Sequence, residues 1–421
     1  MMATAYIVSV LGLVLAWKMH DRYDPARYFA GFWGLQILLI ATLFYTTFAF
    51  NGRGLTYIAG MGLVFSAGSV LGRGMGKNLT EKASRGVFRP TLALRMLQFS
   101  LLMAVLNLVE GLWVNGYAFG DLFSGEALLR LNDAASDNRY LSPLPVSLWS
   151  RITLVFLYVT PLYGGYLLPL LEGKKRIWTV VTVLPSLLMA LTLSVKSTFI
   201  TSVALYGVGV LVSAYANNRD FLKVGKATLL KWIAGGMLFL GLLFLSMVLR
   251  TGQFDRASVR QTEQKIVIYA CGHLPAFDAW FQDHVGHLKP SWGVKTFYGL
   301  SNPLGLAKRE QGVFTDYVIL VKQQGKPVPH LMDTNVYTIF RFLLEDFGLL
   351  GSAVFILLAG MLAGYSWLQV KKRPDNPLFQ VVLMAILFTI AWSFVGSVWA
   401  YTSYMLTMVL MLGLLKLTFA R

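Results

Sequence analysis

Several positively charged side chains lie beside apolar stretches of this chain, where cations are uncommon. Lys196 lies in the short polar turn 194–198 between two apolar runs, and Arg250 ends another run. Arg256 and Arg260 follow closely. Fixed cations at a membrane boundary could hold a polyanion, such as a lipid pyrophosphate, through charge-assisted hydrogen bonds. The alternative is that each side chain extends to lipid phosphates on its own.

A second group of polar residues runs from His330 into an apolar stretch. Asn335, Thr338, Arg341 and Glu345 recur at spacings of three or four residues, so on a helix they would share one face. This face could bind a ligand together with Tyr337. The structural alternative is a salt bridge of Arg341 that seats the helix at the membrane edge.

Histidine is the residue type best suited to accept a proton at neutral pH. His330 is therefore our first candidate for a general base, and Asp333, which would need help from its surroundings, is the second. The alternative is that His330 is a loop residue after the turn 327–329. His284 and His287 are spaced as two metal ligands could be, but no third ligand follows at a telling spacing. We expect no metal site and no cofactor.

The elements that must position these residues belong to a membrane protein. Of the 421 residues, 56% are hydrophobic and 14% are charged, whereas soluble domains contain about 25% charged residues. The net charge of +17 does not indicate nucleic-acid binding, because the basic residues lie in short segments between apolar runs. The single Cys271 excludes an intrachain disulfide.

The apolar runs predict about eleven membrane-spanning helices in an all-α polytopic fold. Residues 1–17 lack the basic start and the cleavage site of a signal peptide. The expected spans are 2–17, 28–50, 55–72, 92–112, 151–171, 177–195, 198–215, 232–249, 348–369, 377–396 and 398–418.

Lysine and arginine alternate between the two sides of these spans. The segments 18–27, 73–91, 172–176, 217–231 and 371–376 hold 3, 5, 3, 4 and 3 of them, 18 in all, whereas the alternate short segments hold 4. The positive-inside rule places the richer set in the cytoplasm, the N-terminus outside and the C-terminus inside.

The predicted spans and their orientation divide the chain into three parts. Residues 1–249 would form eight spans with a small outer loop at 113–150, and residues 347–421 would form the last three. Between them, residues 250–346 would form a large outer loop, whose aromatic residues and five prolines indicate a folded cap of short helices.

The string Thr334-Asn335-Val336-Tyr337-Thr338, continued by Arg341 and by Glu345-Asp346-Phe347-Gly348-Leu349-Leu350-Gly351-Ser352, resembles the signature of Wzy-type O-antigen polymerases. More loosely it resembles a segment of the O-antigen ligases. In both families this segment closes the large periplasmic loop. The stretch Leu274-Pro275-Ala276-Phe277-Asp278 is also similar to the polymerases' loop, and Lys196 stands where these families usually have arginine. The motif covers about twenty residues, and the layout agrees over most of the chain.

The resemblance implies a C-type membrane glycosyltransferase of the bacterial inner membrane. It would transfer a growing glycan from undecaprenyl pyrophosphate to the next lipid-linked repeat unit, in O-antigen, capsule or exopolysaccharide synthesis. Membrane lipid and a chain-length-regulating co-polymerase are the implied partners. Ligases have an essential histidine directly before the asparagine, where this chain has Thr334, so the identity of the base stays open. The alternatives are an O-antigen ligase and a polysaccharide flippase, although transporters usually show repeated halves and this chain shows none.

Overall fold

The computed structural model describes most of the chain. The described residues are 2–44, 46–76, 87–118, 120–121, 124, 130–131, 147–193, 195–217, 235–238, 241–242, 244, 266–308, 318–323, 326–333 and 337–420. They belong to two compact units. Unit 1 comprises residues 1–83 and 267–405, and unit 2 comprises residues 84–266 and 406–421.

Unit 1 contains the long helices from both ends of the chain and the described part of the large loop. Its helices are α1 (Met2–Met19), α2 (Pro25–Leu43), α3 (Arg53–Gly76), α12 (His273–His284), η2 (Val285–His287), α13 (Tyr298–Ser301), α14 (Ile339–Lys372), α15 (Pro377–Trp392) and η3 (Val398–Ala400). Its strands are β2 (Val318–Gln323) and β3 (Lys326–Asp333), which pair antiparallel with an irregularity between Val318 and Leu320.

Unit 2 contains the middle of the chain and most of the last helix. Its elements are β1 (Val87–Phe88), α4 (Pro90–Val114), α6 (Leu148–Leu167), α7 (Lys175–Val181), α8 (Leu184–Thr192), α9 (Lys196–Ala216), α16 (Thr402–Thr418) and β4 (Phe419–Ala420). The short strands β1 and β4 pair antiparallel.

The chain is a polytopic, mainly helical membrane protein. Among the described residues, six helices are long and apolar enough to cross a membrane: Met2–Met19, Arg53–Gly76, Pro90–Val114, Lys175–Thr192, Lys196–Ala216 and Ile339–Lys372. Two shorter apolar helices, α15 and α16, occupy two further expected spans. The expected span 232–249 lies largely outside the described residues, so the count of eleven stays a prediction.

Several boundaries differ from the expected ones for local reasons. Helix α14 begins at Ile339, nine residues before the expected span, because residues 339–347 of the motif segment are helical. The expected span 177–195 is divided into α7 and α8, and Pro185 stands at the start of α8, where a missing backbone N–H does least harm. The described part of the large loop also contains the hairpin β2–β3, whereas only helices were expected.

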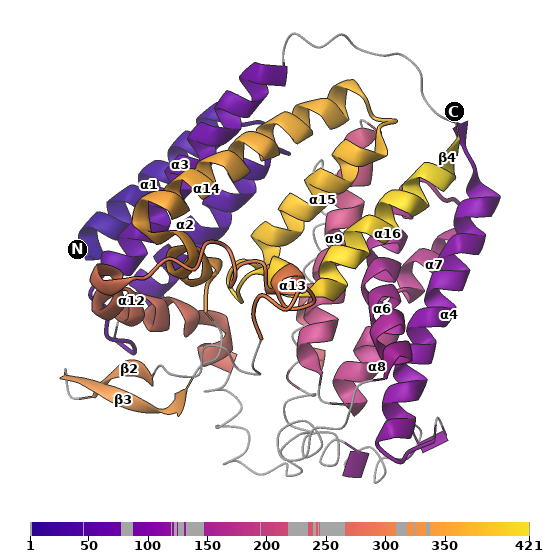
Figure 1. Cartoon of the computed structure of the whole chain (residues 1–421), viewed down its shortest axis with the longest axis horizontal. Helices are drawn as coiled ribbons and strands as arrows, with labels where there is room; N and C mark the ends of the chain where they lie inside the picture. Colours follow the sequence, from indigo (N-terminus) through magenta and orange to yellow (C-terminus); the bar gives the residue numbers. More distant parts are fainter. Residues whose placement is uncertain are drawn as a thin grey trace. The chain divides into compact units, whose positions relative to one another are not determined.

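Glycines bring α3 and α14 into contact, and the two helices lie side by side in unit 1 (Figure 1). A Cβ added at Gly68 would lie 2.2 Å from the carbonyl oxygen of Leu357, and one at Gly72 would lie 1.9 Å from that of Met361. On α14, Gly360 and Gly364 meet α3 backbone in the same way. Small residues four apart permit this close approach of helices in a membrane.

The two ends of unit 1 differ in chemistry. At one end Arg73 lies 3.5 Å from the buried carboxylate of Asp24 and donates to the carbonyl oxygen of Met19, and Lys372 donates to that of Gly76. Three of the segments expected in the cytoplasm thus meet at one end. The described residues of the large loop contact the helices at the other end. Which compartment each end faces stays a prediction.

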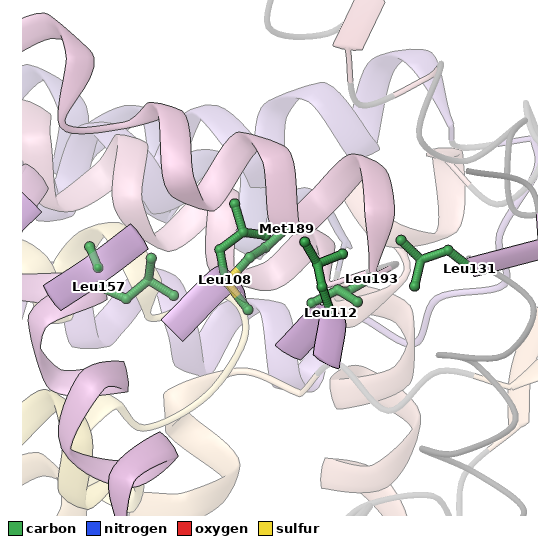
Figure 2. Packing of buried hydrophobic residues seen from close by; sticks show 7 residues of the cluster. Leu108, Leu112, Leu131, Leu157, Met189 and Leu193 are labelled. Atoms are coloured by element: carbon green, nitrogen blue, oxygen red, sulfur yellow. The ribbon is translucent and has the colours of Figure 1, made fainter. Parts of the chain in front are cut away.

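Unit 2 is built on a second glycine contact. A Cβ at Gly165 of α6 would lie 2.1 Å from the carbonyl oxygen of Tyr206, and one at Gly209 of α9 would lie 2.2 Å from that of Leu162. An apolar cluster joins α4, α6 and α8, and Figure 2 shows its side chains. Its labelled members are Leu108, Leu112, Leu131, Leu157, Met189 and Leu193.

Candidate functional site

Residues 339–352 of the motif segment form the beginning of α14. Its first backbone N–H, that of Ile339, donates to the carbonyl oxygen of Ser393 at 2.7 Å. Arg341 and Glu345 then lie one turn apart, and Nε of Arg341 donates to Oε1 of Glu345 at 2.9 Å. The expectation of a shared helical face is confirmed for these two residues. Thr338 precedes the first helical residue, and Asn335 lies outside the described residues.

Arg341 is enclosed by aromatic rings as well as by its carboxylate partner. Its side chain is buried, and its guanidinium carbon lies 4.4 Å from the ring centre of Tyr337 and 5.0 Å from that of Trp280. Cation–π contacts of this kind gain strength where water is excluded. Arg341 therefore joins α14 to α12, which carries Trp280.

Glu345 joins a second cation to this cluster. The ammonium group of Lys295, from the loop between η2 and α13, forms an ion pair with Oε2 of Glu345. One carboxylate thus lies between a buried guanidinium and a lysine that remains about one third exposed (34%). Two cations beside one carboxylate leave this cluster with a formal charge of +1. The adjacent carboxylate of Asp346, which accepts from the backbone N–H of Lys295, balances this charge, so the four residues together are formally neutral.

Asp346 holds the loop against α14. Its fully buried carboxylate accepts hydrogen bonds from the hydroxyl of Ser291, from the backbone N–H of Lys295 at 3.1 Å and from that of Thr296 at 2.5 Å. Its backbone carbonyl accepts from the N–H of Trp292 at 2.9 Å. Residues 291–296 are therefore fixed to the first two turns of α14.

A glycine ends this tightly bonded stretch. Gly348 has φ 65° and ψ −171°, a conformation that is open to glycine and strained for other residues. The helix axis changes at this point, between the loop-binding turns 339–347 and the apolar part of α14. Two residues of the motif thus have local structural roles. Asp346 anchors the loop through its carboxylate, and Gly348 permits the kink that follows.

A second carboxylate fixes α12 to the start of α3. Asp278 accepts hydrogen bonds from the backbone N–H groups of Asn51 at 2.7 Å, Gly52 at 2.9 Å and Gly54 at 2.8 Å. Asn51 and Gly52 directly precede α3 and Gly54 lies in its first turn, where backbone N–H groups have no acceptor within the helix and the helix dipole favours an anion. A Cβ at Gly54 would lie 2.8 Å from Cα of Asp278, so glycine is needed for this approach.

Aromatic packing completes the contact between α12 and the long helices. The ring of Tyr57 lies 5.2 Å from Phe281 and 6.0 Å from Phe340. Its hydroxyl shares a hydrogen bond of 2.6 Å with Ser352, the last residue of the motif string. The motif is therefore bonded to α3 at its end and to α12 at its beginning.

The remaining candidate residues are distributed differently. Lys196 is the first residue of α9 in unit 2 and is half-buried. His330 and Asp333 belong to β3, so the expected turn at 327–329 is a strand. Arg250, Arg256, Arg260 and Asn335 lie outside the described residues. Their roles, and that of Lys196, stay predictions.

The structure adds residues that the motif reading missed. Lys295, Ser291 and Trp280 all contact the motif helix, although they lie about fifty or more positions away in sequence. Nothing in their local sequence marks them. Asp278 was part of the loop stretch that resembles the polymerases, but its role as an anchor could not be read from sequence.

The histidines of the loop do not form a metal site in the described part of the chain. Within it, no group of three or more histidine, cysteine, aspartate or glutamate residues could hold a metal ion. His284 stacks on Trp280 with ring centres 5.5 Å apart. His273 is fully buried, and burial lowers its pKa to about 3, so its imidazole is neutral at physiological pH.

Comparisons with known proteins give no family for this chain: no family model, no curated protein and no solved structure matches it.

Proposed function

We propose that this protein polymerises lipid-linked oligosaccharide repeat units at the outer face of the membrane. The donor would be a glycan on undecaprenyl pyrophosphate, and the acceptor would be the next repeat unit. The observation that carries the proposal is the segment from Thr334 to Ser352, which resembles the polymerase signature. Its described residues, Tyr337 to Ser352, join a long apolar helix to the loop and to α12.

The proposed reaction breaks the bond between the donor sugar's anomeric carbon and the pyrophosphate oxygen. A new bond forms between that carbon and an acceptor hydroxyl oxygen, whose proton passes to a base, and undecaprenyl pyrophosphate leaves. Negative charge builds on the leaving group, which fixed cations stabilise. Lys196, Arg250, Arg256 and Arg260 are the proposed cations.

Arg341 has a supporting role in this proposal. Its guanidinium is buried between Tyr337 and Trp280 and is bonded to Glu345, so it contributes mainly by holding α12 against α14. Lys295, which is partly exposed beside Glu345, is the cation of this cluster that a ligand reaches more easily. Within unit 1, Lys295 is our candidate for a contact with phosphate. Tyr337 is buried and belongs to the support of the site.

The proposal can be tested by complementation, in cells that lack the endogenous gene and express a variant of the protein. Removing one charge-assisted contact made in the transition state costs about 2–4 kcal/mol, a loss in rate of roughly 30- to 1000-fold. Lys196→Ala and Arg250→Ala should therefore leave very short glycans, as measured by gel analysis of the polysaccharide. Lys174→Ala, an exposed lysine in a segment expected in the cytoplasm, is the matched control. Normal chain lengths in both test variants, at equal protein levels, would reject the assignment of these cations.

The same cells separate a polymerase from a ligase. Loss of a polymerase leaves single repeat units on the final acceptor, whereas loss of a ligase leaves none attached. Deleting the gene should give single repeat units. A product with no attached glycan would instead establish the ligase.

The base is tested by two single variants at equal expression. His330→Ala should abolish polymer, because histidine can accept the hydroxyl proton at neutral pH. If His330→Ala keeps full polymer and Asp333→Ala loses it, Asp333 takes this role. If both keep it, the base lies elsewhere.

A further inference from the structure

A group of neutral polar side chains is buried in unit 1 without hydrogen-bond partners among the described residues. Its members are Trp33 of α2, His273 of α12, Thr338 before α14 and Trp392 at the end of α15, and each is at most 3% exposed. The unpartnered atoms are Nε1 of both tryptophans, both ring nitrogens of His273 and the Thr338 hydroxyl. Four segments of the chain thus contribute polar atoms that the described fold leaves unused.

Ring contacts connect Trp33, His273 and Trp392, and the hydrogen bond from the N–H of Ile339 to the carbonyl oxygen of Ser393 joins the segments that carry Thr338 and Trp392. The ring of His273 lies 6.1 Å from Trp33 and 5.6 Å from Phe394. Phe394 in turn lies 6.3 Å from Trp392. On the other side, Trp33 lies 5.1 Å from Phe340, two residues after Thr338. We call Trp33, His273, Thr338 and Trp392, with Phe340 and Phe394, the indole–imidazole cluster.

Burying a donor or acceptor without a partner destabilises a fold, and native proteins show few such groups. Several of them around one group of rings therefore need an explanation. Unpartnered polar atoms among aromatic rings are characteristic of binding sites for small polar ligands. The apolar rings would pack on its carbon atoms, and the nitrogens and the hydroxyl would bond its oxygen atoms.

The chemistry of the cluster selects neutral hydroxyl groups as the ligand. The two indoles can only donate, whereas a neutral imidazole donates through one nitrogen and accepts through the other. The unpartnered atoms all belong to uncharged side chains, so they match hydroxyl groups better than a pyrophosphate. Hydroxyl groups on a ring with apolar faces are the chemistry of a sugar.

We propose that the indole–imidazole cluster binds a sugar of the lipid-linked repeat unit through its hydroxyl groups. This inference rests on the proposed function, and it adds a sugar-binding site in which α2, α12 and the end of α15 meet the motif residue Thr338. Since His273 is fully buried, sugar reaches it when the first turn of α12 moves away from Trp33 and Phe394. Asp278, one and a half turns further along α12, keeps the rest of the helix on α3.

The stability of the full-length protein in detergent gives the first test. His273→Leu removes both unpartnered nitrogens and keeps an apolar side chain, so it should raise Tm by about 2–4 °C while polymer formation in cells falls at least tenfold. His284→Leu is the matched control on the same helix, where the ring already bonds the carbonyl oxygen of Trp280 at 3.0 Å. A lower Tm for His273→Leu would show that the imidazole is bonded within the fold, for example to an ordered water, and would overturn the inference.

The single cysteine provides a direct test of binding. Cys271 lies two residues before His273 and is partly buried, so its reaction with a maleimide reports movement of this turn. Labelling is done at about pH 8, because burial raises the pKa of the Cys271 thiol. Repeat units on undecaprenyl pyrophosphate, extracted from cells lacking the protein, should change the labelling rate at least threefold. Undecaprenyl pyrophosphate without sugar should have no effect.

The outcomes separate this inference from the proposed function. If repeat units change the labelling of wild type and of His273→Leu equally, the sugar site is wrong and the proposed function stands. An equal effect from undecaprenyl pyrophosphate alone would show an anion site and overturn the assignment of sugar. If neither probe alters labelling or Tm of the wild type, both the function and the sugar site fail.

Discussion

Replacing Asp346 should detach the loop 291–296 from α14. The carboxylate accepts three hydrogen bonds, from the Ser291 hydroxyl and from two backbone N–H groups, and it is fully buried. Hydrogen bonds to a charged acceptor contribute about 1.5–3 kcal/mol each, and the two stranded N–H groups add a penalty, although such terms are not additive. We therefore expect Asp346→Ala to cost about 3–5 kcal/mol. Asp346→Asn keeps one acceptor oxygen and should cost about 1–3 kcal/mol.

Thermal unfolding of the full-length protein in detergent measures this effect. Exposure of the single Cys271 to a thiol-reactive dye reports unfolding of unit 1. A loss of 3–5 kcal/mol corresponds to a fall in Tm of about 6–20 °C for a unit of roughly 200 residues. Asp375→Ala, after the far end of α14, is the matched control and should leave Tm nearly unchanged. If Asp346→Ala unfolds within 2 °C of the wild type, Asp346 is not an anchor.

Three further predictions concern packing, pH and topology. Gly72→Ala should cost about 1–3 kcal/mol by overpacking against Met361, whereas Gly74→Ala, with open space around it, should not. Unfolded histidine has a pKa near 6.5 and folded His273 about 3, so the unfolded state binds the extra proton between these values. From pH 7 to pH 5 the wild type should therefore lose about 2 kcal/mol more stability than His273→Leu. Reporter fusions near residues 80 and 290 should report opposite compartments, and the same compartment for both would reject the orientation.

The relation between sequence and structure is clearest at the motif helix. Its spacing predicted that Arg341 and Glu345 share a helical face, and the structure confirms this, because one helical turn fixes their separation. Spacing could not reveal Lys295 on the other side of the same carboxylate. That ion pair joins residues fifty positions apart, so it depends on how the loop returns to α14.

The sequence by itself determined that this chain is a membrane protein, and it gave the approximate positions of most of the apolar helices. Long apolar runs must satisfy their backbone hydrogen bonds within helices, so composition is sufficient for that conclusion. Glycines four apart were visible in the sequence, but only the structure decided which helices they join, since close approach requires partners from two distant segments. The same holds for Asp278 and His273. The Asp278 carboxylate is bonded to the start of α3, and the His273 imidazole is buried among aromatic rings. Neither environment can be read from the sequence, because both depend on tertiary packing.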